Sequence, residues 1–175
     1  TIIDQVEVLK NLVNEFSRYA RMPVTTLAPN DLNAVVAEAV ALFVDSHKDI
    51  HFDFRQAENL PRFNMDAEQI NRVMINLLDN AVASINKKTG HIAVIIRYDE
   101  SKKKVTVAVA DDGAGVPASY KQKVFEPYFS TKKSGTGLGL AIVSSIISDH
   151  KGQVSINDNY PTGTIVSFQL PVVEV

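Results

Sequence analysis

The segment from Ser130 to Leu140 carries glycines at positions 135, 137 and 139, alternating with small or apolar residues. Glycines let the backbone approach a ligand closely and take conformations that a Cβ forbids. An apolar helical pattern follows at once, so the free N–H groups and the positive dipole end of a helix would face that ligand. With Lys132 and Lys133 just upstream, the segment could bind phosphate. Taken alone, it favours a simpler interpretation, a flexible turn before an ordinary helix.

Two asparagines, at positions 76 and 80, stand one turn apart beside the apolar stripe of a strongly amphipathic helix. We predict this helix over 66–86, with Asp66 as its N-cap. A side-chain carbonyl oxygen suits Mg²⁺, which takes few protein ligands together with waters and phosphate oxygens. Two structural amides that tie the helix to a loop explain the pair equally well. The helix alone leaves both interpretations open.

Three further clusters could carry chemistry. Asp111–Gly115 follows a predicted strand, and its first carboxylate could accept a hydrogen bond from an exocyclic amine, although Asp-Gly is also a common turn pair. Phe125–Phe129 holds three aromatic rings that could anchor a mobile loop running to Gly135 or simply belong to the core. The Thr164 hydroxyl, after Gly163, could bond a ring nitrogen or water, although a turn residue is the default interpretation.

Hydrophobic periodicity predicts the remaining elements. Helices are expected over 1–21, 31–46 and 138–149, with a short one over 117–124. Strands are expected over 24–27, 50–54, 92–98, 105–110, 154–157 and 164–170. Residues 99–104 form the turn of a hairpin, and Gly152 is expected to close the helix over 138–149. Helices and strands do not alternate strictly, which favours an α/β (α+β) sandwich in which helices pack on one face of a mixed β-sheet.

The first 21 residues carry a narrow apolar seam with the four-three spacing of a coiled coil or helical hairpin. The seam consists of Ile2, Val6, Leu9, Val13, Phe16 and Ala20. It is too narrow for a helix that faces its own core, so we favour an external partner over packing on the same domain. Pro23 ends the helix. We therefore divide the chain into a helix of residues 1–22 and a domain of residues 23–175.

Composition excludes several classes of protein. A chain of 175 residues is long enough for one domain with its own core, and its net charge of −2 gives no basic footprint for nucleic acid. The absence of cysteine excludes disulfides and thiolate metal sites. No apolar run approaches the roughly 20 residues that span a bilayer. Because the chain begins with Thr1 rather than Met, we expect a piece of a longer protein.

In this order and spacing, the motifs resemble those of the ATP-binding catalytic domain of sensor histidine kinases. That domain belongs to the GHKL superfamily, shared with type II topoisomerases, Hsp90 chaperones and mismatch-repair ATPases. The matching motifs are the asparagine box Asn76–Ala81, the glycine boxes Asp111–Gly115, Gly135–Leu140 and Gly163–Thr164, and the aromatic box Phe125–Phe129. The resemblance covers about residues 24–171. Phe129–Lys132 and Arg21–Pro23 look most like the nitrogen-regulation sensor kinases.

The resemblance implies a Bergerat-type fold, with ATP between helices and a mobile lid of about residues 126–136. It implies that Asp111 accepts the adenine amino group, that Gly115 packs near the ring, and that Thr164 supports the ring through water. Asn80 would hold Mg²⁺, and Asn76 would face the phosphates. The other residues expected at the nucleotide are Gly113, Val116, Lys132, Thr136, Gly137, Leu138, Gly139 and Leu140, with backbone N–H groups of 137–139 on the phosphates.

Two positions depart from the family pattern. Many members carry a lysine and an aromatic residue three and four positions after the second asparagine, where this chain has Ala83 and Ser84. Phosphate charge must then be met from elsewhere. Our hypothesis is that Lys132 is the replacement cation and acts with Asn76 in catalysis.

Hydrolysing members of the superfamily carry a glutamate where this chain has Asn76, and an amide cannot act as a general base near neutral pH. The sequence therefore favours a protein-histidine kinase over a GHKL-type ATPase. The other alternative is a serine-directed, anti-sigma-like kinase or nucleotide-gated interaction module, a class that lacks the apolar seam of residues 2–20. None of the four histidines precedes an acidic residue, so we expect the acceptor histidine on a hairpin helix before residue 1.

The resemblance also implies cofactors and partners. ATP and Mg²⁺ are the expected cofactors. The expected partners are the protein's own dimerisation and phosphoacceptor hairpin and a cognate response regulator. The parent protein is expected to be homodimeric and anchored in a membrane, with this portion in the cytoplasm.

Overall fold

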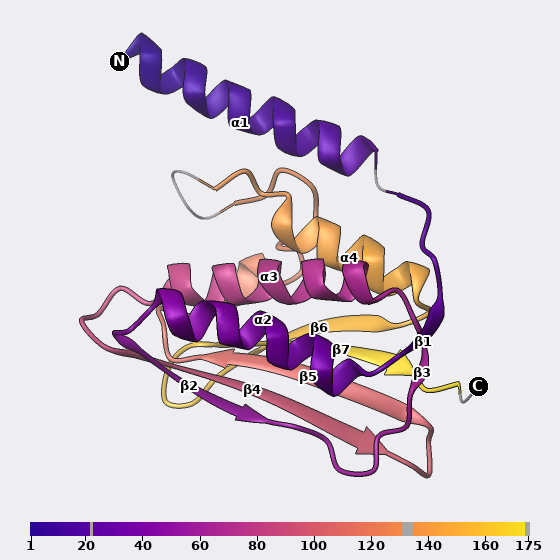
Figure 1. Cartoon of the computed structure of the whole chain (residues 1–175). Coiled ribbons are helices and arrows are strands. Elements are labelled where there is room, and N and C mark those ends of the chain that lie inside the picture. The colour runs from indigo at the N-terminus through magenta and orange to yellow at the C-terminus, as the bar shows by residue number, and fades with distance from the viewer. Residues whose placement is uncertain (22, 131–134, 174–175) are drawn as a thin grey trace.

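The computed structural model describes residues 1–21, 23–130 and 135–173 (Figure 1). Its helices are α1 (Ile2–Ala20), α2 (Leu32–Ser46), α3 (Ala67–Ser84) and α4 (Gly139–Asp149), with a short 3₁₀ helix η1 (Ala118–Tyr120). Its strands are β1 (Ala28–Asn30), β2 (Ile50–Arg55), β3 (Phe63–Met65), β4 (Gly90–Asp99), β5 (Lys104–Asp111), β6 (Gln153–Asp158) and β7 (Thr164–Pro171). Figure 1 shows α1 standing apart above a layered body.

The main sheet is mixed, with the strand order β2-β4-β5-β7-β6. β2 runs parallel to β4, and the other neighbours are antiparallel. Burial alternates along β5, where Val105, Val107 and Val109 lie in the core while the residues between them are half-buried. This period of two is typical of a sheet covered on one face. β1 and β3 form a separate antiparallel pair.

Helices α2, α3 and α4 cover a single face of the main sheet (Figure 1). The helix α3 begins as predicted, because the Asp66 carboxylate caps it by accepting a hydrogen bond from the Gln69 amide at 3.1 Å. Its buried residues recur at helical spacing: Gln69, Ile70, Val73, Met74, Leu77, Leu78 and Ala81. The predicted fold class, a mixed sheet with helices on one face, is confirmed.

The predicted strand over 24–27 is wrong, because this stretch is tied to two helix ends instead of pairing with a strand. The Thr26 amide donates to the Asp66 carboxylate at the start of α3 at 2.8 Å, and Thr25 Oγ1 donates to the Asp149 carboxylate at the end of α4 at 3.4 Å. Just before this stretch, Gln69 Nε2 donates to the Pro23 carbonyl at 3.2 Å. His150, at the end of α4, joins the cluster by accepting from the Asp66 amide at 3.0 Å. The nearest strand, β1, begins only at residue 28, and its short partner β3 was not predicted.

Two other local predictions differ from the structure. Instead of a helix over 117–124 there is only the single turn η1, followed by further turns. The left-handed position after α4 is taken by Lys151, with φ of 59°, and not by Gly152. Gly152 still closes the helix through its amide, which donates to the Ile147 carbonyl of α4 at 2.8 Å, and a Cβ there would collide with the Gln169 carbonyl of β7.

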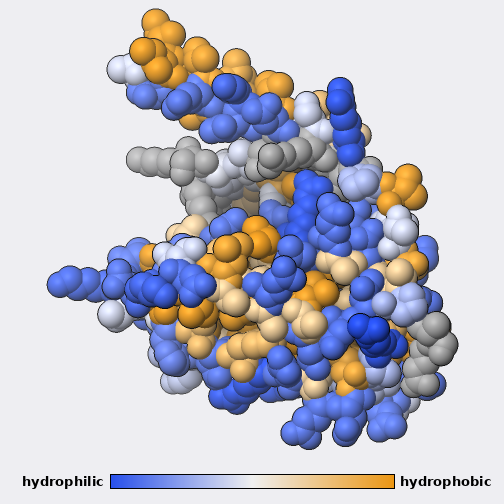
Figure 2. Space-filling view, viewed as in Figure 1, coloured by the Kyte–Doolittle hydropathy of each residue, from blue (hydrophilic) through white to orange (hydrophobic). Residues whose placement is uncertain are grey.

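The apolar seam of α1 faces away from the body. Ile2, Val6, Leu9 and Val13 are between 54% and 80% exposed. Figure 2 shows hydrophobic side chains gathered along the outer side of α1 and polar ones on the side toward the body. Within the described ranges, no helix combines the length and the hydropathy that crossing a membrane requires.

Candidate nucleotide-binding site

A cavity of about 680 Å³ lies between α3, the start of α4, the loop after β5 and the strands β6 and β7. Most residues predicted for the site line it. These are Asn76, Asn80, Asp111, Gly115, Val116, Thr136, Gly137, Gly139, Leu140 and Thr164. The fold thus brings into one cavity motifs that lie up to 88 residues apart in the sequence, from Asn76 to Thr164.

Asp111, the last residue of β5, is 4% exposed and lies in this cavity. Its Oδ1 atom accepts two hydrogen bonds, from Ser84 Oγ at 2.8 Å and from the Gly113 amide at 2.9 Å. Thr164, the first residue of β7, is also buried and lines the same cavity. A buried carboxylate and a buried hydroxyl facing one cavity are suited to recognising a polar ligand edge.

The loop between β6 and β7 is hydrogen-bonded to the loop that follows Asp111. Asn159 Nδ2 donates to the Asp111 carbonyl at 2.8 Å, and Thr162 Oγ1 donates to the Gly113 carbonyl at 2.9 Å. Gly163 has a φ of 117°, and a Cβ there would collide with the Asp111 carbonyl. Only glycine fits this position, because both the dihedral and the space exclude a side chain.

The opposite end of the cavity is formed by α3 and the start of α4. Asn76 Nδ2 donates to the Arg72 carbonyl at 2.8 Å, which leaves Oδ1 on the side of Gly139. A Cβ on Gly139 would lie 3.0 Å from Asn76 Oδ1 and 3.8 Å from Asn80 Nδ2. The two predicted asparagines therefore stand directly beside the N-terminus of α4, where free backbone N–H groups favour an anion.

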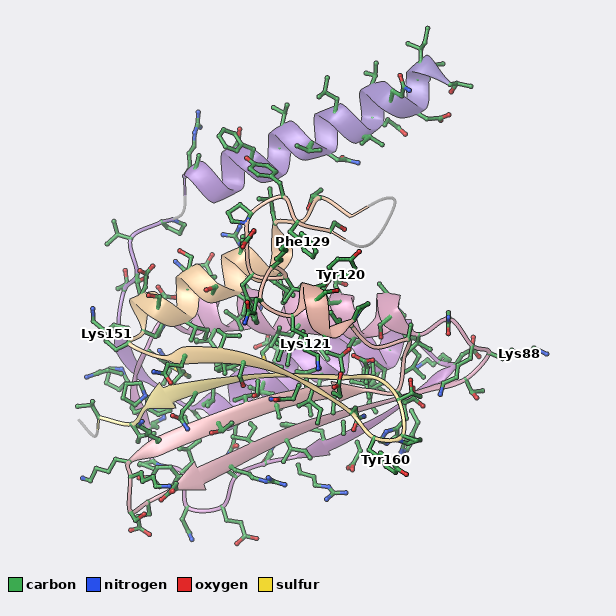
Figure 3. All side chains as sticks on the ribbon, turned by 180° about the vertical axis from the view of Figure 1, so that it is seen from behind. Lys88, Tyr120, Lys121, Phe129, Lys151 and Tyr160 are labelled. Carbon is green, nitrogen blue, oxygen red and sulfur yellow. The ribbon has the colours of Figure 1, made fainter. Side chains whose placement is uncertain are left out.

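The aromatic segment and the glycine segment meet at the mouth of the cavity. The Tyr128 amide donates to the Gly137 carbonyl at 2.9 Å. Gly137 has a φ of 70°, and a Cβ there would collide with the backbone of Tyr128 and Phe129. Figure 3 shows Tyr120 and Phe129 next to each other, with ring centroids 5.4 Å apart. Below them, Lys121 Nζ lies 2.6 Å from Asp158 Oδ2, which ties this segment to the end of β6.

Two of the predicted site residues that the structure describes, Leu138 and Gly113, do not line the cavity. Leu138 is fully buried in the core just before α4, so only its backbone is available to a ligand. Gly113 packs against Ser84, and a Cβ there would collide with that residue. Lys132 lies outside the described residues.

Sequence reasoning missed Ser84 as a site residue. Its hydroxyl bonds the Asp111 carboxylate, and it lines the cavity. One feature of the sequence could have pointed to Ser84. It stands where many members of the family have an aromatic residue at the nucleotide site.

Comparison with known proteins gives a consistent result. Residues 65–174, more than half of the chain, match the family model described as histidine kinase-, DNA gyrase B- and HSP90-like ATPase. The chain belongs to this family. The matched range contains every motif that lines the cavity, so membership in this ATPase family accounts for the arrangement and implies ATP as the ligand.

Individual relatives are sensor histidine kinases. The chain is 30% identical to the nitrogen regulation protein NtrY of Azorhizobium caulinodans over 162 residues, which is 90% of this chain and 21% of NtrY. The solved catalytic domain of histidine kinase ThkA is 32% identical to this chain, with a TM-score of 0.74. The match covers 83% of this chain and 95% of that domain. ThkA in its complex with the response regulator protein TrrA is 27% identical to this chain, with a TM-score of 0.80. That match covers 98% of this chain and 49% of the ThkA chain.

These matches confirm the family and fold expected from the motifs. Within it, the chain has the fold of the catalytic domain of sensor histidine kinases, and the alternatives of another ATPase or a serine-directed kinase are not favoured. The chain spans only about a fifth of the length of NtrY. The roles of individual residues at the nucleotide stay predictions.

The donors present at the asparagine end fit a magnesium ion bound together with a nucleotide. Within the described ranges, no three side chains of the histidine, cysteine, aspartate or glutamate type gather to hold a metal. A cation beside Asn80 would therefore take most of its ligands from phosphate oxygens and water. Mg²⁺ binds in this way in many phosphate-handling enzymes.

Proposed function

We propose that this chain binds Mg·ATP and transfers the γ-phosphate to a histidine on a helical hairpin of its parent protein. The observation that carries the proposal is the single cavity that joins the Asp111 carboxylate to the asparagines and glycines beside α4. Asp111 would accept the adenine amino group, and Asn80 would hold Mg²⁺. When bound, the ion would screen phosphate charge.

The amide at position 76 supports transfer over hydrolysis. Asn76 stands beside the start of α4, where a hydrolase of this superfamily needs a carboxylate to activate water. An amide has no basic lone pair near neutral pH, and a histidine acceptor brings its own nucleophilic nitrogen. Positioning and charge stabilisation are then the tasks left to the protein.

The exposed seam of α1 supports a hairpin as the partner, because apolar residues at coiled-coil spacing are stabilised when a second helix covers them. We divide the chain accordingly into residues 1–22, the end of the hairpin, and residues 23–175, the catalytic domain. The complex of ThkA with TrrA supports a response regulator as the second partner. A homodimeric, membrane-anchored parent with this portion in the cytoplasm completes the proposal.

Transfer can be tested with a separately produced hairpin that carries the candidate histidine. The chain, ATP labelled at the γ-phosphate and Mg²⁺ are mixed with this hairpin, and we expect an acid-labile label on it. A hairpin with that histidine replaced by glutamine is the matched control and should stay unlabelled. Acid-stable label would favour serine phosphorylation, stable label on the chain itself would contradict the missing acceptor, and steady phosphate release without the hairpin would favour an ATPase.

Lys132 provides a second test, since we propose it as the cation that replaces the family's lysine. Lys132→Ala should weaken ATP binding by about tenfold, and ADP binding less, because only ATP carries the γ-phosphate charge. Lys88→Ala, at the exposed tip of the loop after α3 (Figure 3), is a control that keeps the same change in net charge. Equal losses for ATP and ADP would contradict the assignment.

A further inference from the structure

Ser84, the last residue of α3, contacts the loop after β5 through both its side chain and its backbone. Its Oγ lies 2.8 Å from Asp111 Oδ1, and its carbonyl accepts a hydrogen bond from the Ala114 amide at 3.1 Å. Gly113 sits so close to Ser84 that a Cβ would not fit between them. The end of α3 and the Asp111 loop are therefore held together by two hydrogen bonds and a close backbone approach.

The two donors on Asp111 both reach the same carboxylate oxygen. Ser84 Oγ and the Gly113 amide bond Oδ1, which fixes the plane of the carboxylate. In the described part of the chain, no further donor reaches the Asp111 carboxylate, and Asp111 lines the cavity, so Oδ2 is the oxygen left for a ligand. An ionised oxygen only accepts hydrogen bonds, so it favours a ligand that offers an N–H and disfavours one that offers a carbonyl.

A purely structural role for Ser84 has to be weighed as well. The hydroxyl has one hydrogen, and a second acceptor, the Ala81 carbonyl, lies 2.7 Å away. That carbonyl lies at the end of α3. The Ile85 amide, four residues later, bonds the Val82 carbonyl and not the Ala81 carbonyl. Capping the helix would explain this contact. The carboxylate is the stronger acceptor because it is charged, so the hydrogen favours Asp111.

We propose that Ser84 is a positioning residue that sets the purine specificity of the site. By holding Oδ1, it presents Oδ2 to the 6-amino group of adenine and disfavours a 6-oxo purine at the same place. This inference rests on the proposed binding of ATP and adds to it the residue that makes Asp111 selective.

The test compares three nucleotides with different groups at purine position 6: ATP with an amino group, inosine triphosphate with an oxo group beside a protonated N1, and the triphosphate of unsubstituted purine riboside with hydrogen alone. In Ser84→Ala, ATP affinity should fall by about three- to tenfold, the range of one ordinary net hydrogen bond, because Ser84 acts on the ligand only through Asp111, while the other two affinities hold. Ser84→Thr keeps the hydroxyl and should restore the preference for ATP. Thr162→Ala is the matched control, because Thr162 bonds the Gly113 carbonyl without touching the carboxylate. It should lower all three affinities alike.

A second variant keeps the proposal testable if Ser84→Ala folds poorly. In Asp111→Asn, the donors Ser84 and Gly113 require the amide oxygen at the Oδ1 position, which places the amide N–H groups toward the ligand. The preference should then invert, with inosine triphosphate bound more tightly than ATP. Adding Ser84→Ala to this variant should weaken the inversion, because the amide is then held by one donor only.

The outcomes separate this inference from the function on which it rests. A wild-type chain that binds no adenine nucleotide overturns the proposed function. A wild-type chain that prefers ATP, with equal losses for all three nucleotides in Ser84→Ala, overturns only the role of Ser84 and leaves it a helix cap. Unchanged affinities for all three nucleotides in Ser84→Ala would also overturn the role of Ser84.

Discussion

The two ends of the cavity are built in different ways. At the Asp111 end, side chains from α3 and from the loop between β6 and β7 bond one short turn, and these contacts span between 27 and 49 residues of sequence. At the asparagine end, the Asn76 amide bonds Arg72, four residues earlier, and Tyr128 bonds Gly137. The Asp111 end, proposed to hold the purine, is therefore fixed by contacts between distant segments, whereas the asparagine end, proposed to hold the phosphates, relies more on local backbone bonds and on groups that a nucleotide would bring. Groups fixed in advance favour selectivity, because little ordering is lost on binding.

The largest effect is expected at Gly163, where the backbone packs most closely against the Asp111 carbonyl. Gly163→Ala should lower the free energy of unfolding by about 2–4 kcal/mol, because its Cβ would strain a φ of 117° and meet the Asp111 carbonyl. Urea denaturation measures this loss. Gly139→Ala is the control for stability, since that residue is helical and meets only side chains at 3.0 Å or more. A similar loss in both variants would remove the distinction between the two ends.

The second prediction concerns the ion that the phosphate end is proposed to need. Asn80→Ala should reduce Mg·ATP affinity by about 30-fold, which is about 2 kcal/mol, and leave ATP affinity in the presence of a chelator nearly unchanged. Titration calorimetry with and without Mg²⁺ measures both values. An equal loss under both conditions would mean that Asn80 acts on the nucleotide directly and not through the metal.

Gly139→Ala should also weaken nucleotide binding without weakening the fold. Its methyl group would lie beside Asn76 Oδ1, in the space that phosphate oxygens are proposed to occupy. We expect about tenfold weaker binding of ATP and a smaller loss for adenosine, which has no phosphate. Competition titrations with the two ligands measure the difference. Equal losses would show that the methyl group distorts the whole cavity.

The smallest effect is expected at Asp112, the residue that follows Asp111. Partial burial raises the pKa of the Asp112 carboxyl, but hydrogen bonds from Lys87 and the His91 amide, with the Lys87 charge, outweigh it and lower this pKa below its ordinary 3.8. A lowered folded-state pKa contributes stability above the unfolded pKa, and that stability is lost as the pH falls through the folded value.

Asp112→Asn should accordingly flatten the acid side of the stability profile by less than about 1 kcal/mol, because Lys87 is half exposed. Urea denaturation at pH 6 and at pH 3 measures the difference. The wild-type chain should lose more stability than the variant over this interval. The reverse order would contradict the sign of the shift.

Local patterns explain what could be predicted from the sequence. The span of α3, its Asp66 cap and the facing asparagines follow from helical periodicity and capping, which act within a few residues. The alternating valines of β5 likewise predict a strand whose end carries Asp111. The family is predictable for a similar reason, because its motifs are short runs of residues whose order along the chain is visible in the sequence.

Contacts between distant residues explain what was missed. Ser84 looks like an ordinary end of a helix until the sheet brings Asp111 beside it, 27 residues later. Gly113 was expected to make room for a ligand, but in the structure it makes room for Ser84. The stretch 24–27 was predicted as a strand, yet its Thr26 amide bonds the Asp66 cap of α3 and its Thr25 hydroxyl bonds Asp149 at the end of α4.

The place of β7 in the sheet has a consequence for the order in which the chain matures on the ribosome. β7 is the last of the strands to be translated, but it inserts between β5 and β6, two strands that emerge earlier. Until it arrives, β5 has an open edge, and Gly163 and Thr164 cannot take their places beside Asp111. The selectivity for the base that we propose would therefore be among the last properties that a nascent chain acquires, well after α3 has been synthesised.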